Sequence, residues 1–286
     1  MFSILTINSA LQDIRILGRS VYRPIAYIRQ RLSVLADQIR QLDPDIVCLQ
    51  ELFHYNLQQQ FYRLLKDRLP YACGFAKQGL KFRLGNELIT LSKFPVKNGR
   101  FFRFNKAALE EKIFTNKGFF KMIIEIPGAG ELQLINFHMT AGGLRYHPEH
   151  PAMELIRSSQ IQQVIKQTSA SVPAILAGDL NAGPGASRKN YDEAINSGFT
   201  DTFTIAGGEG ISWDPGNLLI QWHGEYHLPP QRVDHIFINK PAEHVIKPAS
   251  AAIVLDDASI ELMNGAKIPV SDHYGVQVTF ETVTGD

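Results

Sequence analysis

The sequence predicts one α/β domain with two central β-sheets and with helices outside them. Short apolar runs typical of buried strands alternate with longer amphipathic patterns typical of helices. No repeat or low-complexity linker divides the chain, and its 286 residues suit one large domain that buries enough surface to fold without disulfides or metal. We therefore expect a single catalytic domain over residues 1–286, with loops that hold its functional side chains.

The first part of the chain alternates strands with helices. Apolar residues between Ile25 and Leu42 recur at spacings of three and four, which is the pattern of one helix face, and Pro24 suits a first helical turn. Shorter apolar runs predict buried strands. The expected elements are a strand over Phe2–Ile7 ending at Asn8, this helix, a strand over Asp45–Leu49, and a helix over Leu57–Leu65 that ends near Pro70.

The rest of the chain is richer in strands. Pro127 to Gly130 predicts a hairpin turn between two apolar runs, and the last strand alternates cleanly between apolar and polar residues. The expected elements are strands over Leu88–Leu91, Phe119–Ile126 and Leu132–Phe137, a helix over Ala152–Gln167, and strands over Ala174–Ala177, Val233–Ile238 and Val276–Phe280.

Composition excludes several classes of protein. With 29 basic and 28 acidic residues the chain has a net charge of +1, which excludes a strongly basic nucleic-acid binder. Cys48 and Cys73 are too few for a zinc cluster or a disulfide framework. No stretch approaches the about 20 apolar residues of a membrane span. The first residues lack a secretion signal, so we expect a cytoplasmic protein or a secreted one whose signal has been removed.

Two aromatic segments have two interpretations each. Phe101–Phe104 favours a buried strand, but its aromatic and basic residues would also suit an exposed tip at a lipid surface or on nucleic-acid bases. Trp222 and Tyr226 have the same two interpretations. A peripheral membrane contact through such residues is therefore an alternative to their burial.

Polar residues of related chemistry follow or border six of the apolar runs. They are Asn8, Glu51, His138, Asp179 with Asn181, Asp234, and Asp272 with His273. Each could be a turn cap when considered alone. Together they predict a pocket of oxygen ligands and two histidines, because packed strands can bring their ends to one edge. Carboxylate and amide oxygens favour Mg²⁺, or Mn²⁺, over zinc, and a phosphate-ester substrate would complete such a coordination sphere.

Two common catalytic motifs are absent from the sequence. No Gly-x-x-x-x-Gly-Lys-Ser/Thr segment is present, which argues against a P-loop nucleotide hydrolase. No Gly-x-Ser-x-Gly segment is present, which argues against an acyl hydrolase.

The ordered motifs resemble those of the endonuclease/exonuclease/phosphatase superfamily, which includes DNase I, abasic-site endonucleases, inositol polyphosphate phosphatases and neutral sphingomyelinases. The motifs are Asn8, Gln50-Glu51, Gly178-Asp179-Leu180-Asn181, Arg232-Val233-Asp234 and Ser271-Asp272-His273. They occur in the superfamily's order over nearly the whole chain. The resemblance implies a metal-dependent phosphoric ester hydrolase with a four-layer α/β sandwich of two central mixed β-sheets flanked by helices.

The resemblance also implies a role for each of these residues. Glu51 with Asn8 would hold Mg²⁺, and Asp272 would support the metal. His273 would be the general base, with Asp234 orienting its ring. Asp179 would orient the attacking water, Asn181 would bind the phosphoryl oxygens, and His138 would bind the phosphate or assist the leaving oxygen. Asn86 resembles a family position near His138, for which Glu87 is an equally reasonable candidate.

Among the branches, neutral sphingomyelinases are the most similar. The matching segments are Asn116-Lys117-Gly118-Phe119, His138-Met139-Thr140-Ala141, Arg157 with Gln160, and Trp213-Asp214 with Asn217. Lys117 would then bind substrate phosphate, with an ordinary surface lysine as the alternative, and Trp213 would contact substrate. This similarity favours cleavage of a lipid head group over nucleic acid. A metal-dependent nuclease or DNA-end phosphodiesterase and a catalytically silent binding module remain the alternatives.

Overall fold

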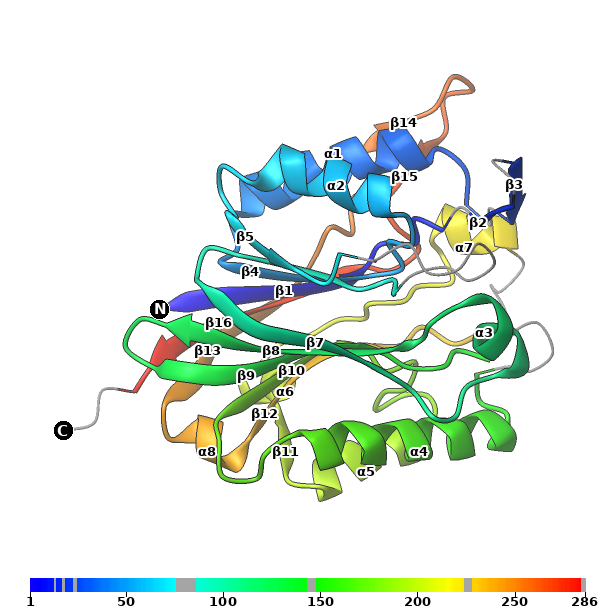
Figure 1. Cartoon of the computed structure of the whole chain (residues 1–286). Coiled ribbons are helices and arrows are strands. Elements are labelled where there is room, and N and C mark those ends of the chain that lie inside the picture. The colour runs from blue at the N-terminus through cyan, green and yellow to red at the C-terminus, as the bar shows by residue number, and fades with distance from the viewer. Residues whose placement is uncertain are drawn as a thin grey trace.

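In the computed structural model, two six-stranded β-sheets pack face to face and helices cover the outer face of each (Figure 1). The structure describes residues 1–12, 14–16, 19–22, 25–75, 86–142, 148–223 and 228–283. Both sheets are mixed, and the arrangement is a four-layer α/β sandwich of the DNase I type. The predicted fold class is therefore confirmed.

The first sheet consists of β1 (Phe2–Asn8), β4 (Ile46–Gln50), β5 (Tyr71–Cys73), β6 (Ile89–Ser92), β13 (Ile246–Val254) and β16 (Gly275–Thr282), in the order β13-β16-β1-β4-β6-β5. β1 lies in its middle, antiparallel to β16 and parallel to β4. The parallel register pairs Asn8 with Gln50, so the carboxyl ends of both strands meet at the same edge. Asn8 and the residue after Gln50, Glu51, are thereby brought to neighbouring positions.

The second sheet consists of β7 (Val96–Arg103), β8 (Gly118–Ile126), β9 (Gly130–His138), β10 (Ala174–Asp179), β11 (Phe199–Asp201) and β12 (Asp234–Asn239), in the order β11-β12-β10-β9-β8-β7. β10 lies between β9 and β12. Its register pairs Asp179 with His138 on one side and with Asp234 on the other. Strand pairing alone therefore places three polar residues side by side.

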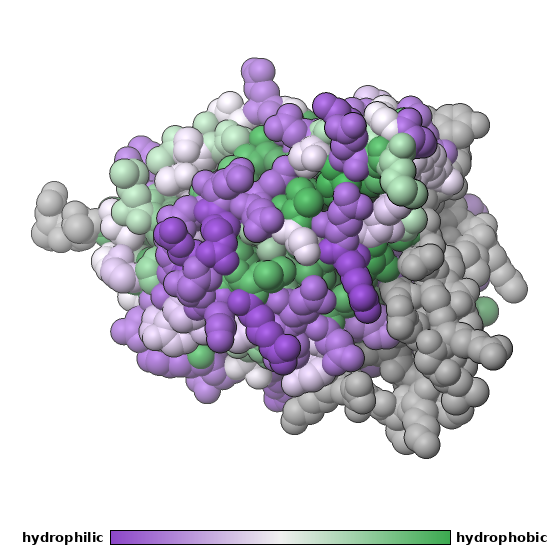
Figure 2. All heavy atoms as spheres, turned by 90° about the horizontal axis from the view of Figure 1, so that it is seen from above, coloured by the Kyte–Doolittle hydropathy of each residue, from purple (hydrophilic) through white to green (hydrophobic). Residues whose placement is uncertain are grey.

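Two helix pairs form the outer layers. α1 (Ile28–Leu42) and α2 (Tyr55–Leu65) cover the first sheet, and α4 (Pro151–Gln167) and α5 (Arg188–Asn196) cover the second (Figure 1). The surface seen from above, over α1 and α2, is mostly hydrophilic with apolar atoms visible between the polar side chains (Figure 2). The shorter elements are β2 (Ile14–Ile16), β3 (Arg19–Tyr22), α3 (Leu109–Phe114), α6 (Thr202–Ile205), α7 (Leu218–His223), α8 (Lys240–Glu243), β14 (Ile260–Glu261) and β15 (Lys267–Ile268). Among the described residues, no helix is both long enough and apolar enough to span a membrane.

The core has three main layers that follow the alternation of side chains along the strands. Leu5 and Ile7 of β1 face the helices α1 and α2, whereas Phe2 and Ile4 face the second sheet. A third cluster fills the space between the second sheet and α4. Each fully buried side chain of this kind contributes roughly 1.5–3 kcal/mol, so these layers supply the main stabilisation of the fold.

A buried polar bridge crosses the layer between the sheets. Asn136 of β9 donates its amide to the backbone carbonyls of Leu49 and Ile89, at 3.2 and 3.1 Å, and accepts from the Gln50 amide at 2.9 Å. Leu49 and Gln50 belong to β4, and Ile89 belongs to β6. The bridge therefore joins the second sheet to two strands of the first, next to the ends that carry Glu51 and His138.

The observed elements agree with most predicted ones and refine some bounds. α1 begins at Ile28, later than the expected start, and Pro24 lies outside the described residues. The Phe101–Phe104 segment belongs largely to strand β7, where Phe102 stacks on Phe119 with ring centroids 5.1 Å apart. The strand interpretation of this segment is confirmed. Trp222 is 49% exposed on α7, and Tyr226 lies outside the described residues.

Candidate active site

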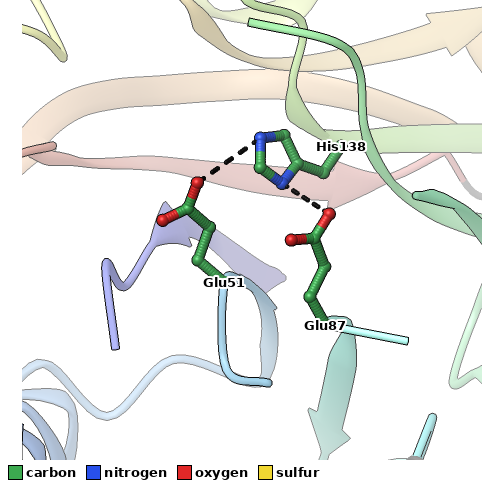
Figure 3. Close-up of side chains that lie close together, drawn as sticks. All are labelled: Glu51, Glu87 and His138. Carbon is green, nitrogen blue, oxygen red and sulfur yellow. Dashed lines mark ion pairs between the residues drawn. The ribbon is translucent and has the colours of Figure 1, made fainter. Parts of the chain in front are cut away.

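The first group of functional side chains comes from both sheets. His138, at the end of β9, is buried, and its Nδ1 lies 2.8 Å from Oε1 of Glu87, just before β6 (Figure 3). Its Nε2 lies 3.8 Å from Oε1 of Glu51, which follows β4. Glu51 adopts φ 60°, a left-handed conformation that turns the chain sharply at the strand end. The two carboxylates thus flank the imidazole from the opposite sheet.

Lys117 fixes the tautomer of His138. Its Nζ lies 2.8 Å from Nε2 of His138 and also donates to the carbonyl of Met139 at 2.8 Å. An ammonium group can only donate, so Nε2 accepts from Lys117 and the proton of a neutral ring lies on Nδ1, 2.8 Å from Oε1 of Glu87. Lys117 is buried and pairs with Glu111 of α3 at 3.2 Å. The lysine is therefore part of the cluster, and its interpretation as a surface residue is wrong.

Asp179 connects this group to a second one. Its Oδ2 lies 3.5 Å from Nε2 of His138 and accepts from the Asn8 amide at 3.0 Å. Its Oδ1 accepts from the backbone N–H of Asn181 at 2.8 Å. Although burial alone would raise it, His273 and His138 hold the pKa of Asp179 below its ordinary value. Asp179 is therefore an ionised, rigidly held carboxylate in the middle of the site.

The second group is a histidine–carboxylate pair. Asp234, at the start of β12, is fully buried, and its Oδ2 lies 2.9 Å from Nδ1 of His273. The backbone N–H of Asp234 donates to Ser212 Oγ at 3.1 Å, and that of His273 donates to Ser271 Oγ at 3.2 Å. Although burial opposes it, Asp234 holds the pKa of His273 well above its ordinary value. This contact orients the His273 ring so that its other nitrogen, Nε2, can face a substrate or water.

Potential ligand atoms fall into two sets. Those of Glu51, Glu87 and His138 lie within 4.8 Å of one another, and so do those of Asp179, Asp234 and His273. Burial, together with the charges of Asp272 and Glu87, raises the pKa of Glu51, which is the effect that a bound cation would reverse. Hard oxygen donors around a carboxylate of this kind suit Mg²⁺. The carboxylates of these sets therefore fit the predicted metal, which Glu51 would hold. The side chain of Asn8, the other predicted holder, donates to Asp179 and accepts from the backbone N–H of Ala10 at 3.1 Å, and its contact with a metal stays a prediction.

Three predicted residues have other immediate contacts. Asp272 is half-buried, with Oδ1 3.3 Å from Ser271 Oγ, and its charge acts on both Glu51 and His273. Asn86 uses its side-chain oxygen to accept from the backbone of Leu88, at 3.2 Å, so Glu87 and not Asn86 contacts His138. Asn181 donates one amide hydrogen to the carbonyl of Met139 at 3.1 Å.

The structure places Trp213 in an apolar cluster next to His273, and its predicted contact with substrate stays a prediction. Its side chain is 6% exposed and packs against Ile220, Leu228 and Val233. Its backbone forms bridges with Gln231 and His273. Through this backbone bridge Trp213 is joined directly to the segment that carries His273.

Two supporting residues were not predicted. Glu111 accepts from Thr140 Oγ1 and from the backbone N–H of Ala141, and so fixes the loop after His138 as well as Lys117. Ser212 holds the backbone of Asp234. Nothing in the sequence singles out either residue, because each acts on a segment far from it along the chain.

The loop after His138 is also held from the outer helix layer. Arg157 of α4, fully buried, donates to the carbonyl of Thr140 at 3.2 Å, and Gln160 accepts from the Thr140 backbone at 2.9 Å. These two residues matched sphingomyelinases in the sequence. In the structure they support the loop and do not reach the cluster themselves.

Chemically, the arrangement suits hydrolysis of a phosphate ester. A bound Mg²⁺ would neutralise charge that develops on the phosphate. In its neutral form, His273 can accept a proton from water at Nε2, and Asp234 stabilises the imidazolium that results. Asp179 can accept a hydrogen bond from that water. The buried ammonium group of Lys117, next to His138, adds a positive charge that would attract an anionic phosphate.

Comparisons with solved structures show the fold. Beta toxin from Staphylococcus aureus is 18% identical with TM-score 0.79, covering 98% of this chain and 99% of the toxin chain, and a structure of its double mutant contains magnesium ions. Sphingomyelinase C from Streptomyces griseocarneus is 20% identical with TM-score 0.76, over 97% and 98% of the chains. Truncated Caenorhabditis elegans TDP2 is 19% identical with TM-score 0.65, over 98% and 97%.

Comparison with sequences gives the family. No curated protein matches the chain significantly. The model of the endonuclease/exonuclease/phosphatase family matches residues 17–273, which span Glu51, His138, Asp179, Asp234 and His273. The chain belongs to the endonuclease/exonuclease/phosphatase family, a family of metal-dependent phosphoesterases.

Proposed function

We propose that this protein is a Mg²⁺-dependent phosphodiesterase that cleaves the head group from a membrane lipid in the manner of a phospholipase C, as sphingomyelinases do. The observation that carries the hydrolytic part is the pair of buried histidine–carboxylate contacts, Glu87–His138 and Asp234–His273, on either side of Asp179. One pair can activate water and the other can bind the phosphate or the leaving oxygen.

The lipid part of the proposal is supported by Lys117. This residue belongs to the Asn116–Phe119 segment that resembles sphingomyelinases, and it contacts His138 directly. Two of the structural neighbours are themselves named as a sphingomyelinase and a toxin. These similarities favour a phospholipid over nucleic acid as the substrate class.

Exposed apolar side chains support a peripheral contact with a membrane. Leu109 and Ile113 of α3 are 56% and 48% exposed, and Trp222 of α7 is 49% exposed. Figure 1 shows α3 and α7 at the same end of the sandwich, the end at which β1 finishes with Asn8. Because the net charge is only +1, such apolar contacts would have to supply much of the binding to a bilayer.

The proposal is tested by incubating the purified protein with sphingomyelin vesicles and Mg²⁺, and separately with plasmid DNA. We expect release of phosphocholine that EDTA abolishes and that the Glu51→Gln variant lacks. Nicking of the plasmid without release of phosphocholine would favour the nuclease alternative. Inactivity towards both substrates and towards other phospholipids, with Mg²⁺ bound, would favour a silent binding module.

A further inference from the structure

Arg31 of α1 is a buried cation whose hydrogen bonds to the residues that the structure describes all go to backbone carbonyls. Its side chain is 0% exposed. Its Nη1 donates to Ser9 at 3.3 Å and to Val270 at 2.9 Å, and its Nη2 donates to Ala10 at 2.6 Å. Its Nε donates to Ala26 at 3.1 Å. One guanidinium group therefore joins three separate segments of chain.

Among the residues that the structure describes, none forms a direct ion pair with Arg31. Within the described part of the chain, no carboxylate lies in hydrogen-bond contact with its guanidinium, although Asp272 and Glu51 act on it at longer range. Burial lowers the pKa of Arg31 to about 10. A buried arginine without a salt bridge is costly, since its charge loses hydration without gaining a direct partner. In return, the planar guanidinium group, with its fixed N–H directions, holds several backbone carbonyls in one arrangement.

The segments that Arg31 joins carry the metal and base residues. Ser9 and Ala10 directly follow Asn8, and Val270 directly precedes Ser271-Asp272-His273. Ser271 tightens the same junction, because its Oγ donates to the carbonyl of Asn8 at 2.6 Å and accepts from the His273 backbone at 3.2 Å. Arg31 thus lies directly behind the turn at which β1 and the 270–273 loop meet.

We propose that Arg31 is a positioning residue, which sets the places of Asn8 and Asp272 towards the metal and of His273 towards the attacking water. The inference about His273 rests on the proposed function, whereas the inference about the metal does not require a substrate. Arg31 touches neither metal nor reacting atoms and acts only through the backbone of the two loops.

The test compares Arg31→Lys and Arg31→Met with matched variants of Arg40, which lies on the same helix with its side chain 38% exposed and pairs with Asp67. The readout is Mn²⁺ affinity by electron paramagnetic resonance at a temperature at which near-ultraviolet circular dichroism shows native packing. We expect both Arg31 variants to bind Mn²⁺ at least 10-fold more weakly, because an ammonium group keeps the charge but lacks the fork. The Arg40 variants should match the wild type.

Wild-type Mn²⁺ affinity in folded Arg31→Lys would overturn the proposal. If the methionine variant does not fold, the lysine variant and Ser271→Ala, which cuts the same junction from the other side, keep the test decisive. Because Mn²⁺ binding needs no substrate, failure of the wild type to hydrolyse lipid would reject the proposed function and leave this inference standing. Where lipid is hydrolysed, Arg31→Lys should lower kcat more than it raises KM.

Discussion

His273 Nδ1 lies 2.9 Å from Asp234 Oδ2, although the two residues are 39 positions apart and lie in segments that belong to different sheets. Asp234 starts a strand of the second sheet, and His273 lies in the loop that leads to β16 of the first. The contact is possible only when both sheets have packed. This histidine–carboxylate pair, which we propose to be catalytic, therefore forms only in the complete sandwich and not in either half.

The first prediction concerns Asp234. Asp234→Asn keeps a side chain of the same shape but removes the charge that stabilises the His273 imidazolium, so we expect kcat to fall by about 10²-fold or more. Steady-state kinetics on the substrate identified by the vesicle assay measures this. The exposed Asp257→Asn is the control and should keep wild-type turnover. Equal turnover in the two variants would contradict the role of Asp234.

The second prediction concerns metal binding at Glu51. Burial and the charges of Asp272 and Glu87 raise its pKa, so Glu51→Gln relieves repulsion when no metal is present. We expect the Tm of the variant in EDTA to be equal to that of the wild type or higher by about 2–4 °C, which corresponds to about 1 kcal/mol for a large domain. Mg²⁺ should raise the Tm of the wild type but scarcely that of the variant. Thermal unfolding with and without Mg²⁺ tests both expectations, and an undiminished Mg²⁺ shift would exclude Glu51 as a ligand.

The third prediction separates stability from catalysis at Lys117. Lys117→Met leaves the buried Glu111 carboxylate without its cationic partner and should lower the free energy of unfolding by about 3–5 kcal/mol. Adding Glu111→Gln should restore much of that stability but not the turnover, because His138 still lacks its contact with the ammonium group. Urea unfolding and kinetics are measured on both variants. Lys112→Met, an exposed change on α3, serves as the control. Recovery of turnover in the double variant would show that Lys117 is only structural.

The fourth prediction concerns the pH dependence of stability. His235 is buried, with Nε2 2.8 Å from the Ala182 carbonyl and Nδ1 2.7 Å from Arg232, and burial together with Arg232 lowers its pKa to about 3. The unfolded chain, with a histidine pKa of about 6.5, takes up this proton first as the pH falls. The folded state should therefore lose about 2 kcal/mol from this residue between pH 7.5 and pH 5.

A comparison of variants isolates the contribution of His235. His235→Phe keeps a ring where His235 stacks on Phe237, with centroids 5.0 Å apart, but removes the titration. Its free energy of unfolding should fall less steeply with acid than that of the wild type when both are measured in urea. Parallel pH profiles for the two proteins would mean that His235 binds its proton equally in the folded and unfolded states.

The sequence allowed the edge of the site to be predicted because its residues directly follow apolar strands. Asn8, Glu51, His138 and Asp179 each stand at or just after a strand end, and parallel pairing brings such ends together. The histidine–carboxylate contacts were only inferred through the family resemblance, since no local pattern connects Glu87 to His138. In the structure, the packing of the two sheets brings Glu87 to His138.

Other features have no readable signal in the sequence. β13 is an exposed edge strand that contains Pro248 and several small residues, so it lacks the apolar alternation of an inner strand. Glu111 lies on a helix of only six residues, and its carboxylate meets Lys117 only after β8 has formed. Trp213 could equally have faced solvent or core by its chemistry, and the residues that cover it, Ile220 on α7 with Leu228 and Val233, show no regular apolar spacing in the sequence.

The amide bridge between Asn136 and Gln50 limits how the two sheets can slide over each other. In the native alignment the donors of Asn136 meet the carbonyls of Leu49 and Ile89. A shift by one residue would leave these amides facing hydrocarbon, at a cost of about 1–3 kcal/mol for each unsatisfied group. Apolar contacts alone are compatible with several alignments of the two sheets, whereas these hydrogen bonds form in only one. The spacing between Glu51 and His138 therefore depends on these hydrogen bonds between the sheets, and weakening them would make that spacing less well defined without altering either residue.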